Sequence, residues 1–257
     1  MKPKAIIIRT AGTNCDWETQ KALEFSGADA ERIHVNQLIN KKIKLFDYQI
    51  LVIPGGFSYG DDIASGKILA NEIKCKLGNE IKAFALSGKP ILGICNGFQI
   101  LVKMGLLPDP ENIVQTTTLT FNDSDKFECR WINLKKEKTQ CIWTKTLPEI
   151  IPLPVAHGEG KFIAADKKAL NALEEKNQIV FRYVNEKGNP GGYPFNPNGA
   201  QNNIAGICNI KGNILGLMPH PERFIYRWQH PTRQIKGDGT EAGWGLEIFK
   251  NAVNYVK

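Results

Sequence analysis

The strongest constraint on the fold is a series of short strand-like runs with helix-like segments between them. The runs near the start are Ala5–Ile8, Glu31–Val35, Gln49–Ile53 and Ile91–Ile94. Most are nearly continuous apolar residues, as in strands that are covered on both faces of a parallel sheet. Helices are predicted over Thr13–Phe25, Lys67–Leu77 and Asn79–Ser87. This alternation predicts an α/β fold with a doubly wound, mostly parallel sheet flanked by helices.

The chain changes character after Pro108, where shorter strands and polar turns follow one another. Strands are predicted over Thr116–Thr120, Phe127–Leu134, Cys141–Trp143, Ile151–Ala156 and Ile179–Val184, with a hairpin formed by Ile204–Asn209 and Ile214–Met218. Helices are predicted over Ala169–Lys176 and Gly243–Val256, a loop over Gly188–Asn203 and an irregular segment over Phe224–Gly243. Because no repeat or linker interrupts the chain, residues 1–257 are predicted to form a single domain with an antiparallel β extension.

Composition narrows the class of protein. The formal net charge of the 257 residues is +7, but the lysines are spread along the chain, which favours a solvated surface over a nucleic-acid site. No apolar run reaches membrane-spanning length, and no signal peptide is recognisable. The six cysteines include no Cys-x-x-Cys pair, so neither a metal site nor a disulfide framework is indicated. We therefore expect a cytoplasmic protein that binds neither nucleic acid nor a membrane.

The segment most suggestive of chemistry follows the Ile91–Ile94 strand. Gly93 and Gly97 bracket Cys95, and a helix-like segment begins directly after it. This is the pattern of a nucleophile elbow, in which a sharp strand-to-helix turn presents the reactive atom at the strand's carboxyl end. The positive end of the following helix favours a thiolate. Taken alone, Gly-x-Cys-x-Gly is weak evidence, and it favours a buried structural cysteine over a nucleophile.

A cysteine nucleophile needs a base and an orienting acid, and Met218–Glu222 offers both. His220 and Glu222 are two residues apart in an extended segment, so their side chains can share one side of the chain. Proline on each side of His220 stiffens that geometry. His157 and His34 are the alternative bases.

Donors for an oxyanion are offered by Gly55 and Gly56, which follow the Gln49–Ile53 strand. The backbone amide of Asn96, directly after the nucleophile, is the second predicted donor. Gln99 lies four residues after Cys95 on the same helix face, where it can contact substrate or simply lie on the helix surface. No nucleotide-phosphate loop is recognisable.

With these residues in view, the chain resembles the class I, triad-type glutamine amidotransferases. The stretches that narrow the resemblance are GGFSYGD (55–61), GICNGFQ (93–99), AHGEGKF (156–162), YPFNPNGAQNNIAGI (193–207) and PHPER (219–223). Together they are similar to the family of glutaminase subunits of phosphoribosylformylglycinamidine synthase, and the resemblance covers nearly the whole chain. Two departures, at Asp62-Ile63-Ala64 and in the long 224–243 segment, bear on contacts with a partner subunit.

The resemblance implies a flavodoxin-like fold and a glutaminase with the triad Cys95, His220 and Glu222. It implies an oxyanion and substrate site at Gly55, Gly56, Asn96 and Gln99, with no metal and no cofactor in this chain. The ammonia released from glutamine would pass to a large synthetase subunit that uses ATP and Mg²⁺ to convert formylglycinamide ribonucleotide to formylglycinamidine ribonucleotide in purine biosynthesis. A small accessory subunit is also expected.

Two other functions fit parts of the sequence. One is a hydrolase of the PfpI/DJ-1-like group, in which histidine follows the nucleophile where this chain has Asn96. The other is a catalytically silent binding module that keeps the fold, because the sequence by itself does not assemble Cys95, His220 and Glu222 in space.

Overall fold

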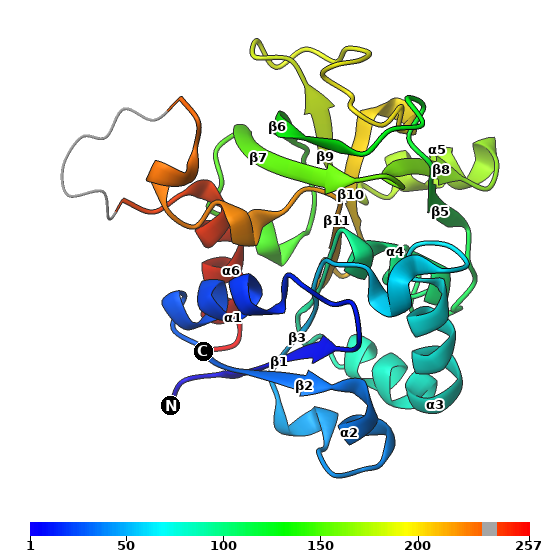
Figure 1. Cartoon of the computed structure of the whole chain (residues 1–257), viewed down its shortest axis with the longest axis vertical. Coiled ribbons are helices and arrows are strands. Elements are labelled where there is room, and N and C mark those ends of the chain that lie inside the picture. The colour runs from blue at the N-terminus through cyan, green and yellow to red at the C-terminus, as the bar shows by residue number, and fades with distance from the viewer. Residues whose placement is uncertain (233–240) are drawn as a thin grey trace.

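The computed structural model describes residues 1–232 and 241–257, and a single large sheet organises them (Figure 1). Its order is β2-β1-β3-β4-β11-β10-β9-β6-β7. The parallel part consists of β2 (Asp29–His34), β1 (Lys4–Arg9), β3 (Ile50–Ile53), β4 (Ile91–Ile94) and β11 (Ile214–Leu217). Strands β3, β4 and β11 are buried at every position. This explains their unbroken apolar sequences, since both faces of the parallel sheet are covered.

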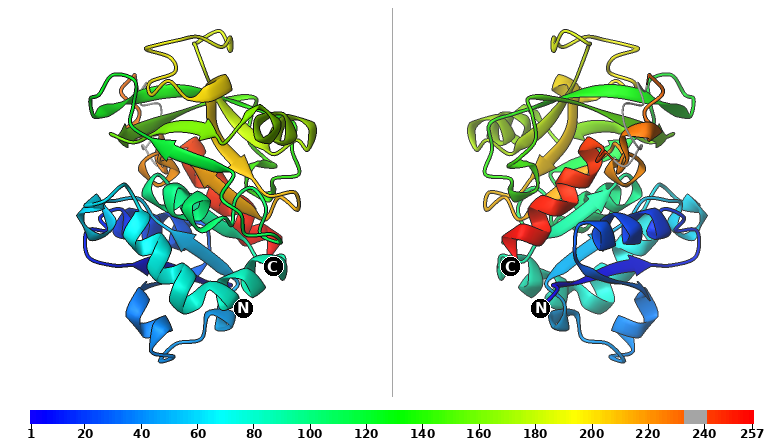
Figure 2. Two further views of the ribbon diagram at one scale, coloured as in Figure 1. Left: turned by 90° about the vertical axis from the view of Figure 1, so that its right-hand side faces the viewer. Right: turned by 90° about the vertical axis from the view of Figure 1, so that its left-hand side faces the viewer.

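Helices cover the parallel part on both sides, as Figure 2 shows. Helices α1 (Asp16–Phe25) and α6 (Trp244–Tyr255) lie on one face, while α3 (Lys67–Leu86) and α4 (Asn96–Met104) lie on the other. The short α2 (Val35–Ile39) follows β2. This is the doubly wound, parallel architecture that the alternation of strands and helices predicted.

The antiparallel extension continues the same sheet beyond β11. It contains β10 (Ile204–Cys208), β9 (Ile179–Val184), β6 (Glu128–Lys136) and β7 (Ile150–His157), each antiparallel to its neighbours. A separate pair, β5 (Thr117–Thr120) with β8 (Lys161–Ala164), lies beside it, and α5 (Lys167–Glu175) follows β8. The predicted mixed sheet is therefore confirmed, including the hairpin of β10 and β11.

Several local predictions were wrong. Cys141–Trp143 is no strand, because Ile142–Thr144 forms a single 3-10 turn with Trp143 fully buried. The helices expected on either side of Gly78 are one helix, α3, since the buried side chains of Leu77 and Ile81 continue its apolar face across the glycine. Within the irregular 224–243 segment, Arg227–Gln229 forms a 3-10 turn and Tyr226 bridges to Ala242, while residues 233–240 lie outside the described residues.

Candidate active site

The strand order brings the predicted site residues to one edge of the sheet. Strands β3, β4 and β11 are adjacent and parallel, so their carboxyl ends meet. Gly55 follows β3, Cys95 follows β4 and His220 follows β11. The Cys95 N–H donates to the carbonyl of Leu217 at 2.8 Å, and the His220 N–H donates to the carbonyl of Pro154 at 2.8 Å. The backbones that carry the candidate nucleophile and base are thus fixed by the sheet itself.

Cys95 occupies a strained turn between β4 and α4. Its backbone has φ 50° and ψ −103°, outside the regions that non-glycine residues ordinarily adopt, as expected at a nucleophile elbow. Gly97 permits this turn, because a Cβ there would lie 1.8 Å from the carbonyl oxygen of Ile53. The Cys95 thiol is 5% exposed and donates weakly to the Ala156 carbonyl at 3.7 Å.

The predicted base and acid form a buried pair. His220 Nδ1 and Glu222 Oε1 are 2.6 Å apart, and both side chains are almost fully buried. Burial alone would lower the pKa of His220, but the Glu222 carboxylate and then the Cys95 sulfur raise it well above its ordinary value. His220 Nε2 has no hydrogen-bond partner among the described residues, so the nitrogen opposite Glu222 is available for proton transfer.

The two glycines after β3 are required by their close neighbours. A Cβ on Gly55 would lie 2.8 Å from Cε1 of His220, and one on Gly56 would lie 2.7 Å from the backbone nitrogen of Asn14. The Phe57 N–H donates to the Gly12 carbonyl at 2.9 Å, and the Cys15 N–H donates to the Gly55 carbonyl at 3.3 Å. The loop after β1 therefore fixes the position of this segment. The N–H of Gly56 has no acceptor among the described residues, which leaves it available to an oxyanion.

Cys15 is a residue of this site that the sequence analysis missed. Its side chain is buried, and its sulfur lies within 4.8 Å of donor atoms of His220 and Glu222. Arg223 Nη2 lies 3.2 Å from the same sulfur, and the thiol donates to Asn14 Oδ1 at 3.2 Å. Burial raises the pKa of Cys15, so a neutral thiol packs against His220. Cys15 reaches His220 because β1, which precedes it, pairs with β3. A single sequence does not show which strands are neighbours in the sheet.

We expect Cys15→Ala to lower kcat for the glutamine hydrolysis that the resemblance implies about 3- to 10-fold, because the His220 ring loses a packing contact that fixes its position. Cys15→Ser should recover most of the loss, since it restores a side chain of similar size. Steady-state kinetics compare these variants with Cys75→Ala, a control at an exposed cysteine. Equal kcat values for Cys15→Ala and Cys75→Ala would show that Cys15 is a bystander.

Asn96 and Gln99 are engaged within the protein. The Asn96 side chain donates to Asp61 Oδ1 at 3.1 Å and to Gln99 Oε1 at 3.0 Å, and Gln99 Nε2 donates to the Glu159 carbonyl at 2.6 Å. The backbone N–H of Asn96, at the first position of α4, has no acceptor within the helix and can serve an oxyanion. A direct contact of Gln99 with substrate stays a prediction, and it would use the second N–H of Nε2 or the second lone pair of Oε1.

The alternative bases have other partners. His157 Nδ1 lies 3.1 Å from Asn122 Oδ1, and its Nε2 lies 3.4 Å from Asn198 Nδ2. Burial, with the nearby His220, lowers the pKa of His157 to about 3. His34 ends β2 at the far side of the parallel sheet and accepts from the Asn36 N–H at 3.3 Å. The geometry therefore favours His220 as the base.

The buried, neutral His157 makes stability depend on pH. Because the pKa of His157 is near 6.5 when unfolded and about 3 when folded, the unfolded chain binds more protons between these values. We expect the free energy of unfolding to fall with decreasing pH by up to about 1.4 kcal/mol per unit from this residue alone. Denaturant titrations of wild type and His157→Gln between pH 7 and pH 4 test this pH dependence of the free energy of unfolding. If the free energy of unfolding varied with pH in the same way in both proteins, His157 would not be the source of the pH dependence.

The Tyr193–Ile207 stretch contributes Asn198, whose side chain contacts the ring of His157. Asn198 is fully buried and donates a hydrogen bond to the Tyr183 hydroxyl at 3.1 Å, as well as contacting His157.

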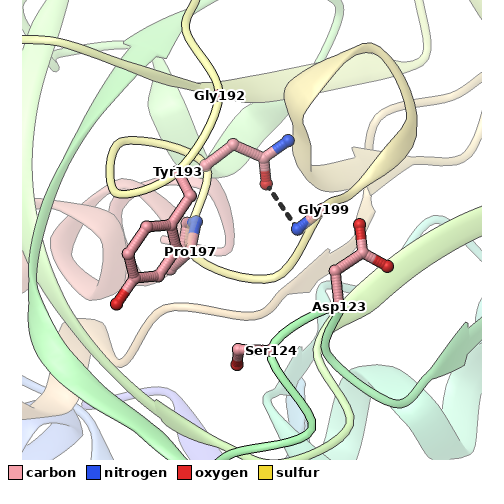
Figure 3. A pocket seen from close by; sticks show the side chains of 7 residues that line it. Asp123, Ser124, Gly192, Tyr193, Pro197 and Gly199 are labelled. Carbon is pink, nitrogen blue, oxygen red and sulfur yellow. Dashed lines mark hydrogen bonds between the residues drawn. The ribbon is translucent and has the colours of Figure 1, made fainter.

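Beside the Tyr193–Ile207 stretch lies a hollow of about 330 Å³, shown in Figure 3. The residues that line the hollow are Asp123, Ser124, Gly192, Tyr193, Asn196, Pro197 and Gly199. It is separate from Cys95, His220 and Glu222, none of which lines it.

A strained cysteine elbow beside a histidine–glutamate pair, at the carboxyl edge of a parallel sheet, defines a class of α/β proteins with a candidate cysteine nucleophile. Comparison with known proteins specifies the family. The model of the CobB/CobQ-like glutamine amidotransferase domain matches residues 2–256.

Relatives and a solved structure agree with that match. The chain is 44% identical over 266 residues to phosphoribosylformylglycinamidine synthase subunit PurQ of Methanococcus maripaludis strain S2, covering 98% of this chain and 97% of the relative. It is 45% identical over 269 residues to the PurQ subunit of Archaeoglobus fulgidus, covering 99% and 97%. A chain in the structure of PurLQS from Thermotoga maritima is similar over 100% of both chains, with a TM-score of 0.75 and 33% identity. The chain therefore belongs to the glutamine amidotransferase family, in the branch formed by the PurQ subunits of phosphoribosylformylglycinamidine synthase.

Proposed function

We propose that this chain is the glutaminase subunit of a phosphoribosylformylglycinamidine synthase. The observation that carries the proposal is the meeting of Cys95, the His220–Glu222 pair and Gly55-Gly56 at adjacent strand ends, in a chain similar over its whole length to PurQ subunits. Like the Thermotoga maritima assembly, named PurLQS, it would work with a PurL synthetase and a PurS accessory subunit.

In the proposed reaction, the Cys95 thiol gives its proton to His220 Nε2 and its sulfur attacks the side-chain amide carbon of glutamine. His220 then passes that proton to the amide nitrogen as the C–N bond breaks and ammonia departs. Glu222 holds the Nδ1 proton across the 2.6 Å contact, which fixes the tautomer of His220 and stabilises its cation. The amides of Gly56 and Asn96 stabilise the tetrahedral oxyanion, and one such donor is commonly worth about 3 kcal/mol. Water activated by His220 then cleaves the thioester to give glutamate.

Ammonia from this step would enter the synthetase partner, which converts formylglycinamide ribonucleotide to formylglycinamidine ribonucleotide with ATP and Mg²⁺. Those cofactors would act in the partner and not in this chain. No helix in the described parts of the chain is long and apolar enough to cross a membrane. We place the complex in the cytoplasm.

The test of the proposal is transfer of the amide nitrogen. Glutamine labelled with ¹⁵N at the amide is given to the chain mixed with the PurL and PurS subunits, ATP and formylglycinamide ribonucleotide. The proposal expects the label in formylglycinamidine ribonucleotide. Unlabelled glutamate should form in an amount equal to that of the labelled product. An absence of labelled product, from a mixture that still uses free ammonia, would favour the silent binding module.

A further inference from the structure

The loop that carries the proposed oxyanion donors, residues 55–66, has a strained backbone. Three successive residues adopt the left-handed region, with φ 55° at Tyr59, 73° at Gly60 and 55° at Asp61. Non-glycine residues hold this conformation only where the surroundings fix it. What fixes this loop therefore contributes, together with the bonds from the loop after β1, to the position of the Gly56 amide.

A closed ring of hydrogen bonds ties the loop to the nucleophile helix. The Asp61 carboxylate accepts from the Gly66 N–H at 3.0 Å and from Asn96 Nδ2 at 3.1 Å. The ring continues from Asn96 to Gln99 at 3.0 Å and from Gln99 to the Glu159 carbonyl at 2.6 Å. The Glu159 carboxylate closes it by accepting from the Ser65 N–H at 3.1 and 3.2 Å.

Charge strengthens this ring. The two carboxylates of the ring lie near the ammonium of Lys103, a residue of α4 that is only 8% exposed. Burial lowers the pKa of Lys103, and Glu159 and Asp61 oppose that shift. Hydrogen bonds to ionised carboxylates are roughly twice as strong as neutral ones, and their strength grows in a poorly solvated setting.

We propose that Glu159 is a positioning residue for the amide-hydrolysis reaction, an inference that rests on the proposed function. Its carboxylate holds the loop through Ser65, while its carbonyl holds the nucleophile helix through Gln99 and Asn96. Glu159 thus keeps two separate segments in one register, so that the amides of Gly56 and Asn96 converge on the same oxyanion. Its hydrogen bonds in the described part of the chain go to Ser65 and Gln99, so its proposed effect on the reaction passes through them.

Kinetics of the complex with its synthetase partner test this role. We expect Glu159→Ala to lower kcat for glutamine hydrolysis about 10- to 100-fold, with KM changed much less, because the oxyanion donors are misaligned. Glu159→Gln keeps an acceptor oxygen and should recover most of the loss. Synthesis from free ammonia and alkylation of Cys95 by iodoacetamide should stay unchanged. Glu175→Ala, on the exposed side of α5, is the matched control.

Amide hydrogen exchange of the isolated chain tests the ring without any catalysis. Exchange over residues 55–66 should be faster in Glu159→Ala than in wild type or in Glu175→Ala. Unchanged exchange, or an unchanged kcat, would overturn the proposal, and a rise in KM alone would make Glu159 a substrate-binding residue instead. A wild-type complex that hydrolyses no glutamine would refute the proposed function, whereas the exchange experiment would still decide whether Glu159 holds the loop of residues 55–66.

Discussion

Replacing Cys95 with alanine should abolish glutamine-dependent synthesis by the complex, with kcat reduced about 10⁴-fold or more. Alanine removes the sulfur at the nucleophile elbow that is proposed to form the thioester, while His220 and Glu222 keep their 2.6 Å contact. Synthesis from free ammonia should continue at the wild-type rate, because ammonia enters after the step that Cys95 carries. Parallel assays with glutamine and with ammonium chloride separate the two steps.

The Cys95→Ala result needs a control for the strained elbow, because φ 50° is costly for any side chain. Cys95→Ser keeps a hydroxyl in nearly the same place and should be inactive with glutamine as well, since a serine hydroxyl is a far weaker nucleophile than a thiolate. Glutamine-dependent synthesis that survives in Cys95→Ala would show that another group attacks the amide.

Replacing Glu222 with glutamine should lower kcat for glutamine hydrolysis about 10²- to 10³-fold, less than Cys95→Ala does. The carboxylate is the main group that raises the pKa of His220, so its loss lets burial lower that pKa. The imidazolium formed during attack is then less stable, although the nucleophile remains. Kinetics give the loss in kcat, and an NMR titration of the His220 ring gives the fall in its pKa.

Glu18→Gln is a suitable control for Glu222→Gln. Glu18 pairs with Arg223 at 3.3 Å, close to the same segment, but its side chain is exposed. Its replacement should leave kcat within about twofold of wild type, as surface ion pairs contribute little. A loss in Glu222→Gln as complete as in Cys95→Ala would mean that Glu222 does more than orient His220.

Local pattern was sufficient to predict the elbow and the contact between His220 and Glu222. The spacing of Gly93, Cys95 and Gly97 follows from steric demands within one strand-to-helix turn. His220 and Glu222 pair as predicted, but the extended segment expected for them was wrong, because Glu222 lies in the 3-10 turn Pro221–Arg223. Such features need no knowledge of distant contacts. The parallel part of the fold was predictable for the same reason, since strands covered on both faces have a distinctive apolar sequence.

Features that depend on strand order were out of reach. Cys15 reaches His220 only because β1 lies beside β3, and the Glu159 ring joins segments that are 94 residues apart in the chain. The break expected at Gly78 reflects the low helix propensity of glycine, about 1 kcal/mol relative to alanine, which tertiary packing of α3 overrides. A single sequence gives the local preference and not the packing that opposes it.

The most direct test of the central claim is mass spectrometry of the complex after reaction with the glutamine analogue diazo-oxo-norleucine. The account predicts one adduct, on Cys95, whose formation is blocked by excess glutamine and is absent in Cys95→Ala. Cys15, buried and neutral beside the base, should remain unlabelled. Labelling of another cysteine, or none in the presence of the synthetase partner, would contradict the assignment of Cys95 as the nucleophile.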